Sequence, residues 1–150
     1  MSALPTLLEH AESERDQIQL ALQRAEENAR RAQAQADQLD GYRGEYRQRW
    51  SAQFRQLGAA EILHCYRSFG DRIDEALTQQ QQQIETARGH VERLRQRLVA
   101  AETRVASVRK LMERRALEQL RLQERRDQRQ TDETAQQIHW RAAQADAARH

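Results

Sequence analysis

The chain has 150 residues, of which 38% are hydrophobic and 32% charged, and its mean hydropathy is −1.05. Ala, Arg, Gln, Glu and Leu dominate and only one Pro and five Gly occur, which is typical of a long helix or coiled coil and excludes a large multilayered core. The formal net charge is +2, and acidic residues alternate with 24 Arg and one Lys, so we expect no nucleic-acid partner, because such proteins usually gather their basic residues into a stripe.

An uninterrupted heptad pattern predicts a first helix over residues 7–57. Thr6 and Glu9 fit a capping box at its start, with Pro5 just outside it. Two lines of residues with alternating three- and four-residue spacing form one face, which we call the first-helix seam. One line is Leu4, Ala11, Ile18, Ala25, Ala32, Leu39 and Tyr46, and the other is Leu8, Arg15, Leu22, Ala29, Ala36, Arg43, Trp50 and Leu57.

The heptad pattern breaks at Gly58 and then resumes, which predicts a turn over residues 58–62, since Gly favours the left-handed cap of a helix. A second helix is expected over residues 63–135. One line of its seam is Tyr66, Ile73, Gln80, Ala87, Leu94, Ala101 and Val108, and the other is Leu77, Ile84, Val91, Leu98, Val105 and Met112. Beyond Met112 the seam positions become polar, and the Ala-rich tail to residue 150 is expected to be frayed or disordered.

These patterns predict an all-α fold, a single domain over residues 1–150 in which two long helices form an antiparallel coiled-coil hairpin. Folding the chain at the predicted turn places Leu4 to Leu8 beside residues 108–119, where the second seam loses its apolar residues. The second helix should therefore extend beyond the first. The small residues Ala25 to Ala36 would face Ile84, Val91 and Leu94, which lets the helices approach closely.

The sequence contains no recognisable catalytic, metal or cofactor site. The five histidines have no i,i+4 pairing, the glycines lack the spacing of a phosphate loop, and a lone Cys65 allows no internal disulfide. A two-helix hairpin also offers no concave pocket in which a carboxylate could become a catalyst. We expect no enzyme, no cofactor, no signal peptide and no membrane insertion, and hence a cytoplasmic protein.

Aromatic residues gather near the predicted turn. Six of the seven are Tyr42, Tyr46, Trp50, Phe54, Tyr66 and Phe69. They could cap the end of the coiled coil, but Tyr42 and Phe54 lie off both seam lines. Helical spacing joins eight residues into two stripes that would suit partner docking: Gln35, Leu39, Tyr42 and Tyr46 on the first helix, and Phe69, Ile73, Ala76 and Gln80 on the second.

Three segments resemble the FliJ family of flagellar export proteins. Gln38 to Arg47 is similar to the family's Tyr-x-x-Glu-Tyr-Arg signature on its first helix. The segment Tyr66-Arg67-Ser68-Phe69, followed by Ile73 and Ala76, resembles the motif of the second helix, and Arg126 to Glu133 resembles a C-terminal Asp-Gln-x-x-x-Asp-Glu element. The resemblance covers nearly the full length, with the motifs in the same order and at the same spacing.

This resemblance implies a non-enzymatic component of the bacterial flagellar type III protein export apparatus. Its implied partners are the export ATPase hexamer, which it would enter like the stalk of a rotary ATPase, and the cytoplasmic domain of the export-gate membrane protein. Other export chaperones are further implied partners, because family members are described as chaperones or chaperone escorts. The protein would be cytoplasmic and associated peripherally with the inner membrane at the flagellar base, with the two aromatic stripes docking the gate.

Two alternatives remain from the residues alone. The stalk protein of an injectisome has a similar architecture but lacks a strong Tyr-x-x-Glu-Tyr signature. A generic coiled-coil scaffold, or a basic rod associated with nucleic acid, would share the composition. Binding to a hexameric ATPase would distinguish a stalk from a scaffold, and a steep dependence of DNA binding on salt would favour the nucleic-acid rod.

Overall fold

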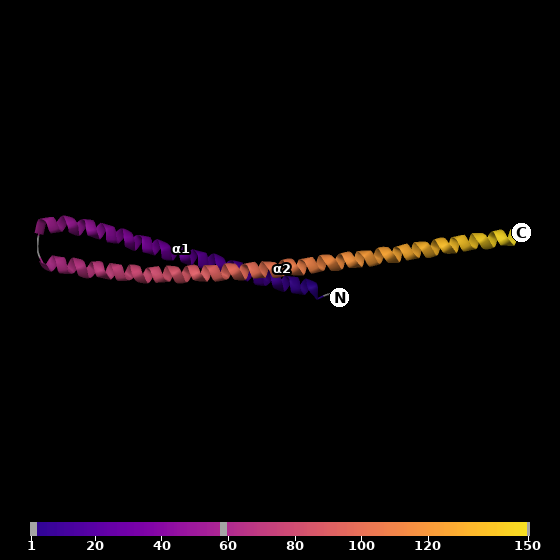
Figure 1. Ribbon diagram of the computed structural model, residues 1–150, viewed down its shortest axis with the longest axis horizontal. Helices are drawn as coiled ribbons and strands as arrows, with labels where there is room; N and C mark the ends of the chain where they lie inside the picture. Colours follow the sequence, from indigo (N-terminus) through magenta and orange to yellow (C-terminus); the bar gives the residue numbers. More distant parts are fainter. Residues whose placement is uncertain (1–2, 58–59, 150) are drawn as a thin grey trace. The chain divides into compact units, whose positions relative to one another are not determined.

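The computed structural model describes the backbone of residues 3–57 and 60–149 and the side chains of residues 3–53 and 60–149. Two helices make up this part of the chain: α1 (Leu4–Leu57) and α2 (Ala60–Arg149), shown in Figure 1. They pack against each other as a hairpin, and α2 has 90 residues where α1 has 54. The predicted all-α hairpin with a longer second helix is confirmed. Of the predicted turn, residues 58–59 lie outside the described residues, and Ala60 already belongs to α2.

Helix α1 begins earlier than the sequence predicted. The backbone N–H of Leu7 donates to the carbonyl oxygen of Ala3 at 3.0 Å, so Ala3 provides the first acceptor of the helix. Pro5 is accommodated in the first turn because its missing N–H would have no helical partner there. Thr6 lies inside the helix, and the expected capping box at Thr6 and Glu9 is therefore not the start of α1.

Helix α2 continues to Arg149, beyond residue 135, where we expected the regular helix to end. The last segment is rich in Ala and Gln, both of which have favourable helix propensities. Within this part of α2 the Gln128 amide donates to the Asp132 carboxylate at 3.3 Å, an i,i+4 contact on the helix surface. The intrinsic helix propensity of these residues, without burial against another helix, accounts for the helical structure of this last segment.

The chain divides into two compact units, and one of them is His10–Thr103. In this unit α1 and α2 run antiparallel, side by side (Figure 1). The buried residues of this unit all lie on the two predicted seams: Ala11, Ile18, Leu22, Ala25, Ile73, Gln80, Ile84, Val91, Leu94 and Ala101. Ile84 is the most deeply buried large side chain, with 1% exposure. Leu22 and Ala25 pack with Val91 and Leu94, so the predicted pairing of small residues with large ones is confirmed at this point.

Contacts between the helices fix one register. Arg43 and Asp74 form a 3.0 Å ion pair, and their residue numbers sum to 117. The ring centroids of Tyr46 and Phe69 are 4.4 Å apart, and their residue numbers sum to 115. Sums that stay close to one value along the helices are the mark of an antiparallel pair. Half of either sum falls near residue 58, at the start of the turn predicted over residues 58–62.

The two arginines that interrupt the first-helix seam are both paired with carboxylates. Arg43 reaches across to Asp74 on α2, and its side chain is one-third exposed. Arg15 contacts Asp16, its neighbour on α1, at 3.0 Å. Each long side chain can lay its methylene groups along the seam while its guanidinium stays near solvent, so the seam tolerates both residues.

The other unit joins the start of α1, up to Glu9, to α2 from Arg104 onward. Leu4, Val105 and Val108 are buried in it, and Met112 is half-buried. From Glu113 to Arg149 every residue is exposed, and this range includes Leu117, Leu120, Leu122, Ile138 and Trp140. The predicted end of the apolar seam at Met112 is confirmed. We call residues 113–149 the α2 extension.

We predict that stability depends on the seam and is insensitive to the α2 extension. Leu94→Ala should lower the free energy of unfolding by about 2–3 kcal/mol, since Leu94 is only 4% exposed but a two-helix core is partly open to solvent. Leu120→Ala makes the same chemical change at a side chain that is 56% exposed and should have little effect. Urea unfolding followed by circular dichroism measures both, and equal losses would contradict this location of the core.

Candidate partner-docking surface

Four aromatic rings form a contiguous cluster near the turn. Tyr46 stacks on Tyr66 with ring centroids 5.6 Å apart and an interplanar angle of 11°. It also contacts Phe69 at 4.4 Å and Trp50 at 5.7 Å in tilted geometries, and Trp50 lies 6.0 Å from Tyr66. Tyr46, Trp50 and Tyr66 occupy seam positions, so these rings serve as the core of the hairpin at this end. The predicted capping role therefore applies to these three residues.

The hydroxyl of Tyr46 stays protonated well beyond neutral pH. Burial raises the pKa of Tyr46 above its ordinary value of 10.0, the nearby Cys65 and Tyr66 raise it further, and a hydrogen bond from Trp50 opposes the rise. A neutral phenol is compatible with the stacked environment, whereas a buried phenolate would be costly. Tyr46 is therefore a structural ring of the cluster, with no ionised form available near pH 7.

The eight residues predicted to form a docking surface come together on one side of the hairpin. Leu39, Tyr46, Ile73 and Gln80 occupy seam positions, and Gln35, Tyr42, Phe69 and Ala76 each lie one residue before a seam position on the same flank. In an antiparallel pair, equivalent flanking positions of the two helices face each other across the seam. Contacts of Gln80 with Gln35 and of Tyr46 with Phe69 confirm that the two stripes meet. We call this flank the Tyr42 face.

Exposure differs among these eight residues. Tyr42 is 69% exposed and Phe69 46% exposed, and Gln35 is also exposed. Leu39, Tyr46 and Ala76 are half-buried, whereas Ile73 and Gln80 are buried between the helices. A partner that approaches this side would first meet the rings of Tyr42 and Phe69. Ile73 and Gln80 would support the surface from below.

Gln80 joins the two helices through its side-chain amide. Its Nε2 donates to the backbone carbonyl of Ala32 at 2.9 Å and to the Oε1 of Gln35 at 3.2 Å. The small side chain of Ala32 lets the amide reach the backbone of α1. Because a buried amide without partners is costly, these bonds favour the one register in which both acceptors are present. Gln80 is thus a positioning residue, which holds Gln35 beside the seam.

On the opposite flank, polar contacts tie the helices together. The Arg43–Asp74 ion pair lies there, and Arg88 donates to Gln33 at 3.1 Å. Glu26 and Arg95 make a looser pair at 3.7 Å. All are partly exposed, so each contributes little to the free energy of unfolding, and their main effect is on register.

The second flank also contains a hollow that the sequence did not predict. Stepping back one heptad from Leu77 along the second seam leads to Gly70, where a core side chain would be expected. Gly70 lies opposite Tyr46 and leaves a cavity of about 180 Å³ whose walls include Tyr46 and Tyr66. The sequence shows that Gly70 places no side chain at this seam position, but it does not indicate whether neighbouring side chains fill the space. The side chain of Phe54, the remaining member of the predicted aromatic cluster, lies outside the described residues.

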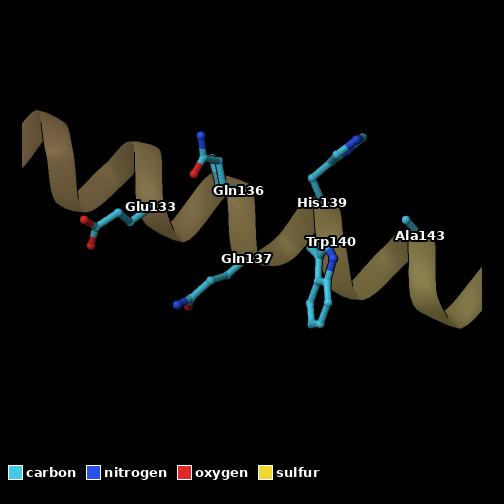
Figure 2. Close-up of a pocket in the computed structure, with 7 residues that line it drawn as sticks. Glu133, Gln136, Gln137, His139, Trp140 and Ala143 are labelled. Carbon is cyan, nitrogen blue, oxygen red and sulfur yellow. The ribbon is translucent and has the colours of Figure 1, made fainter.

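Around Trp140, in the α2 extension, the surface is open. The residues that line this depression, Glu133, Ala135, Gln136, Gln137, His139, Trp140 and Ala143, all come from one stretch of α2. Figure 2 shows His139 and Trp140 projecting to opposite sides of that helix. All of these side chains come from a single helix, so the depression is open to solvent and does not enclose a binding site.

The described part of the chain contains no metal-binding cluster and no membrane-spanning segment. Across residues 3–57 and 60–149, no group of three or more His, Cys, Asp or Glu side chains is placed to hold a metal ion. Neither described helix has a segment long and apolar enough to cross a membrane. The geometry thus offers surfaces for protein contacts: the Tyr42 face, its opposite flank and the α2 extension.

Comparison with known proteins gives one family match. The family model described as "Flagellar FliJ protein" matches residues 1–144, nearly the whole chain. No curated protein and no solved structure matches the chain. The matched range includes the Tyr42 face, its opposite flank and the α2 extension up to residue 144.

We predict that the buried amide of Gln80 stabilises the hairpin. Gln80→Ala removes two hydrogen bonds between the helices and should lower the free energy of unfolding by about 1–2 kcal/mol. Gln81→Ala is the matched control, because Gln81 is exposed on the neighbouring position of the same helix. Chemical unfolding of both variants measures the difference. Indistinguishable unfolding curves would show that the hydrogen bonds do not hold the register.

Proposed function

Because the chain belongs to the flagellar FliJ family, and is thereby a component of the flagellar export apparatus, we propose that it links the export ATPase to the export gate without catalysing a reaction. The observation that carries the proposal is the separation of two exposed surfaces along the chain. The Tyr42 face lies in the hairpin unit His10–Thr103, and the α2 extension lies in the other unit. One chain can therefore bind two partners through residues that do not overlap.

The Tyr42 face is proposed to dock the cytoplasmic domain of the export-gate membrane protein. Tyr42 and Phe69 combine large exposed rings with few rotatable bonds, which is the usual composition of a binding hot spot. The Tyr hydroxyl is compatible with water before binding, so the chain can expose this ring without aggregating. The seam beneath, with Ile73 and Gln80 buried, holds both helices in place, and little conformational entropy would be lost on docking.

The α2 extension is proposed to enter the hexamer of the export ATPase. From Glu113 onward α2 is an exposed helix with apolar side chains in several places, and a surrounding ring of subunits could cover these from all sides. Arginines and carboxylates alternate along it, so its surface suits a polar channel as well. A role as chaperone or chaperone escort would use the same exposed surfaces, and the protein would then act at the cytoplasmic side of the flagellar base.

We predict that Tyr42→Ala weakens gate binding without unfolding the protein. Tyr42 is 69% exposed and lies off the seam, so helicity and melting temperature should stay nearly unchanged. Binding to the gate domain should weaken by roughly 1–3 kcal/mol, as hot-spot truncations do. Calorimetric titration measures the affinity, and swimming motility should fall in parallel.

The matched control is Trp140→Ala, which removes an equally exposed aromatic ring from the α2 extension and should leave gate binding intact. Normal gate binding by Tyr42→Ala would refute the docking proposal. Loss of helical structure in that variant would instead assign Tyr42 to the structural cap of the hairpin.

We also predict that deletion of the residues after Met112 weakens ATPase binding and stimulation. The hairpin unit His10–Thr103 is retained in full, so helicity per residue and gate binding should persist. ATP hydrolysis by the hexamer, measured with and without added protein, tests the effect. Undiminished stimulation by the truncated chain would contradict insertion of the α2 extension.

A further inference from the structure

Gly70 places no side chain at its seam position, although the surrounding structure has room for one. It lies inside α2, at the seam position opposite Tyr46, and borders the cavity of about 180 Å³. A Cβ atom at Gly70 would meet no atom within 4 Å. Alanine would therefore fit, and Gly in a helix interior is less stable than Ala. The helix thus carries an unfavourable residue at a point where neither space nor backbone conformation explains it.

The cavity opens on the flank away from Tyr42. Its polar rim contains Arg47, Arg67 and Asp74, each of which follows a seam residue and so lies on the second flank. Tyr42, Phe69 and the other flanking residues of the Tyr42 face precede seam positions. The cavity therefore opens away from the exposed residues of the Tyr42 face, and the two share only the seam residues Tyr46 and Ile73.

The rim has an excess of positive charge. It contains three arginines, Arg43, Arg47 and Arg67, and two carboxylates, Asp71 and Asp74. Arg43 and Asp74 neutralise each other in the 3.0 Å ion pair. Arg47 and Arg67, with Asp71 beside them, leave one net positive charge at the entrance. The inner wall is aromatic, formed by Tyr46 and Tyr66.

We propose that this hollow at Gly70 receives a glutamate side chain from an acidic segment of a partner protein. The methylene groups of the glutamate would lie against the rings of Tyr46 and Tyr66, and its carboxylate would accept hydrogen bonds from Arg47 and Arg67. A guanidinium binds a carboxylate through two parallel hydrogen bonds, which favours a carboxylate over other polar groups. The two aspartates of the rim disfavour a polymer of phosphates, which would bring many negative charges close to them.

Titration of the isotopically labelled full chain with an acetylated tetraglutamate amide, followed by NMR, tests the proposal. The amide signals of residues 66–74 should shift with added peptide, and a tetraglutamine peptide should cause no such shift. Gly70→Leu fills the hollow and should weaken binding at least tenfold. Combined Arg47→Gln and Arg67→Gln should weaken it at least threefold.

Gly44→Leu is the matched control, since Gly44 is also a helical glycine with no atom within 4 Å of an added Cβ, but lies outside the cavity. Both leucine variants should raise the melting temperature, and only Gly70→Leu should lose peptide binding. If Gly70→Leu lowers the melting temperature, Gly70→Ala replaces it in the test, because the added methyl group meets no neighbour. The expected loss of affinity for the glutamate peptide is then smaller, about threefold.

Three results would overturn the proposal. The glutamine peptide could shift the same signals equally, which would remove the role of the carboxylate. Gly70→Leu could bind the glutamate peptide as well as the unchanged chain, which would remove the role of the hollow. An oligodeoxythymidylate could bind at residues 66–74 where the glutamate peptide does not, which would assign the arginines to a phosphate ligand.

Discussion

The packing of small residues on α1 against large ones on α2 sets the register on which the surfaces of the hairpin unit depend. Ala25 and Ala29 pack in one cluster with Val91 and Leu94, and Ile84 is almost completely buried. Because a coiled coil repeats every seven residues, a slip by one heptad would keep the seams facing each other, but it would change their partners and leave the amide of Gln80 without its two acceptors. Apolar packing supplies most of the stability, and the polar contacts favour the same alignment.

That alignment gives the two flanks of the hairpin different characters. On one flank the exposed rings of Tyr42 and Phe69 flank the seam in which Ile73 and Gln80 are buried. On the other, Gly70 leaves the seam open and arginines surround the gap. A one-heptad shift would separate Tyr46 from both Phe69 and Gly70, so either binding proposal requires the same pairing of helices.

The heptad pattern predicted the fold well because burial in a two-helix hairpin follows sequence periodicity almost directly. Among the described side chains, every buried residue lies on a predicted seam line, including the polar Gln80. The helix ends were harder to predict. The capping box at Thr6 predicted a later start than the observed one at Leu4. The Ala-rich tail, which has no seam, is helical through local propensity alone. At the site, spacing identified the Tyr42 face, whereas the hydrogen bonds of Gln80 and the hollow at Gly70 depend on distances between helices that periodicity does not specify.

Site-specific photocrosslinking tests most directly whether one flank of this hairpin docks the export gate. A benzophenone amino acid replaces Tyr42 on the proposed face, and in a second protein it replaces Gln48, which is exposed on the outward side of α1. Irradiation with the gate's cytoplasmic domain should give a crosslinked product from position 42 and little or none from position 48. Equal crosslinking from both positions, or crosslinking from position 48 alone, would contradict the account.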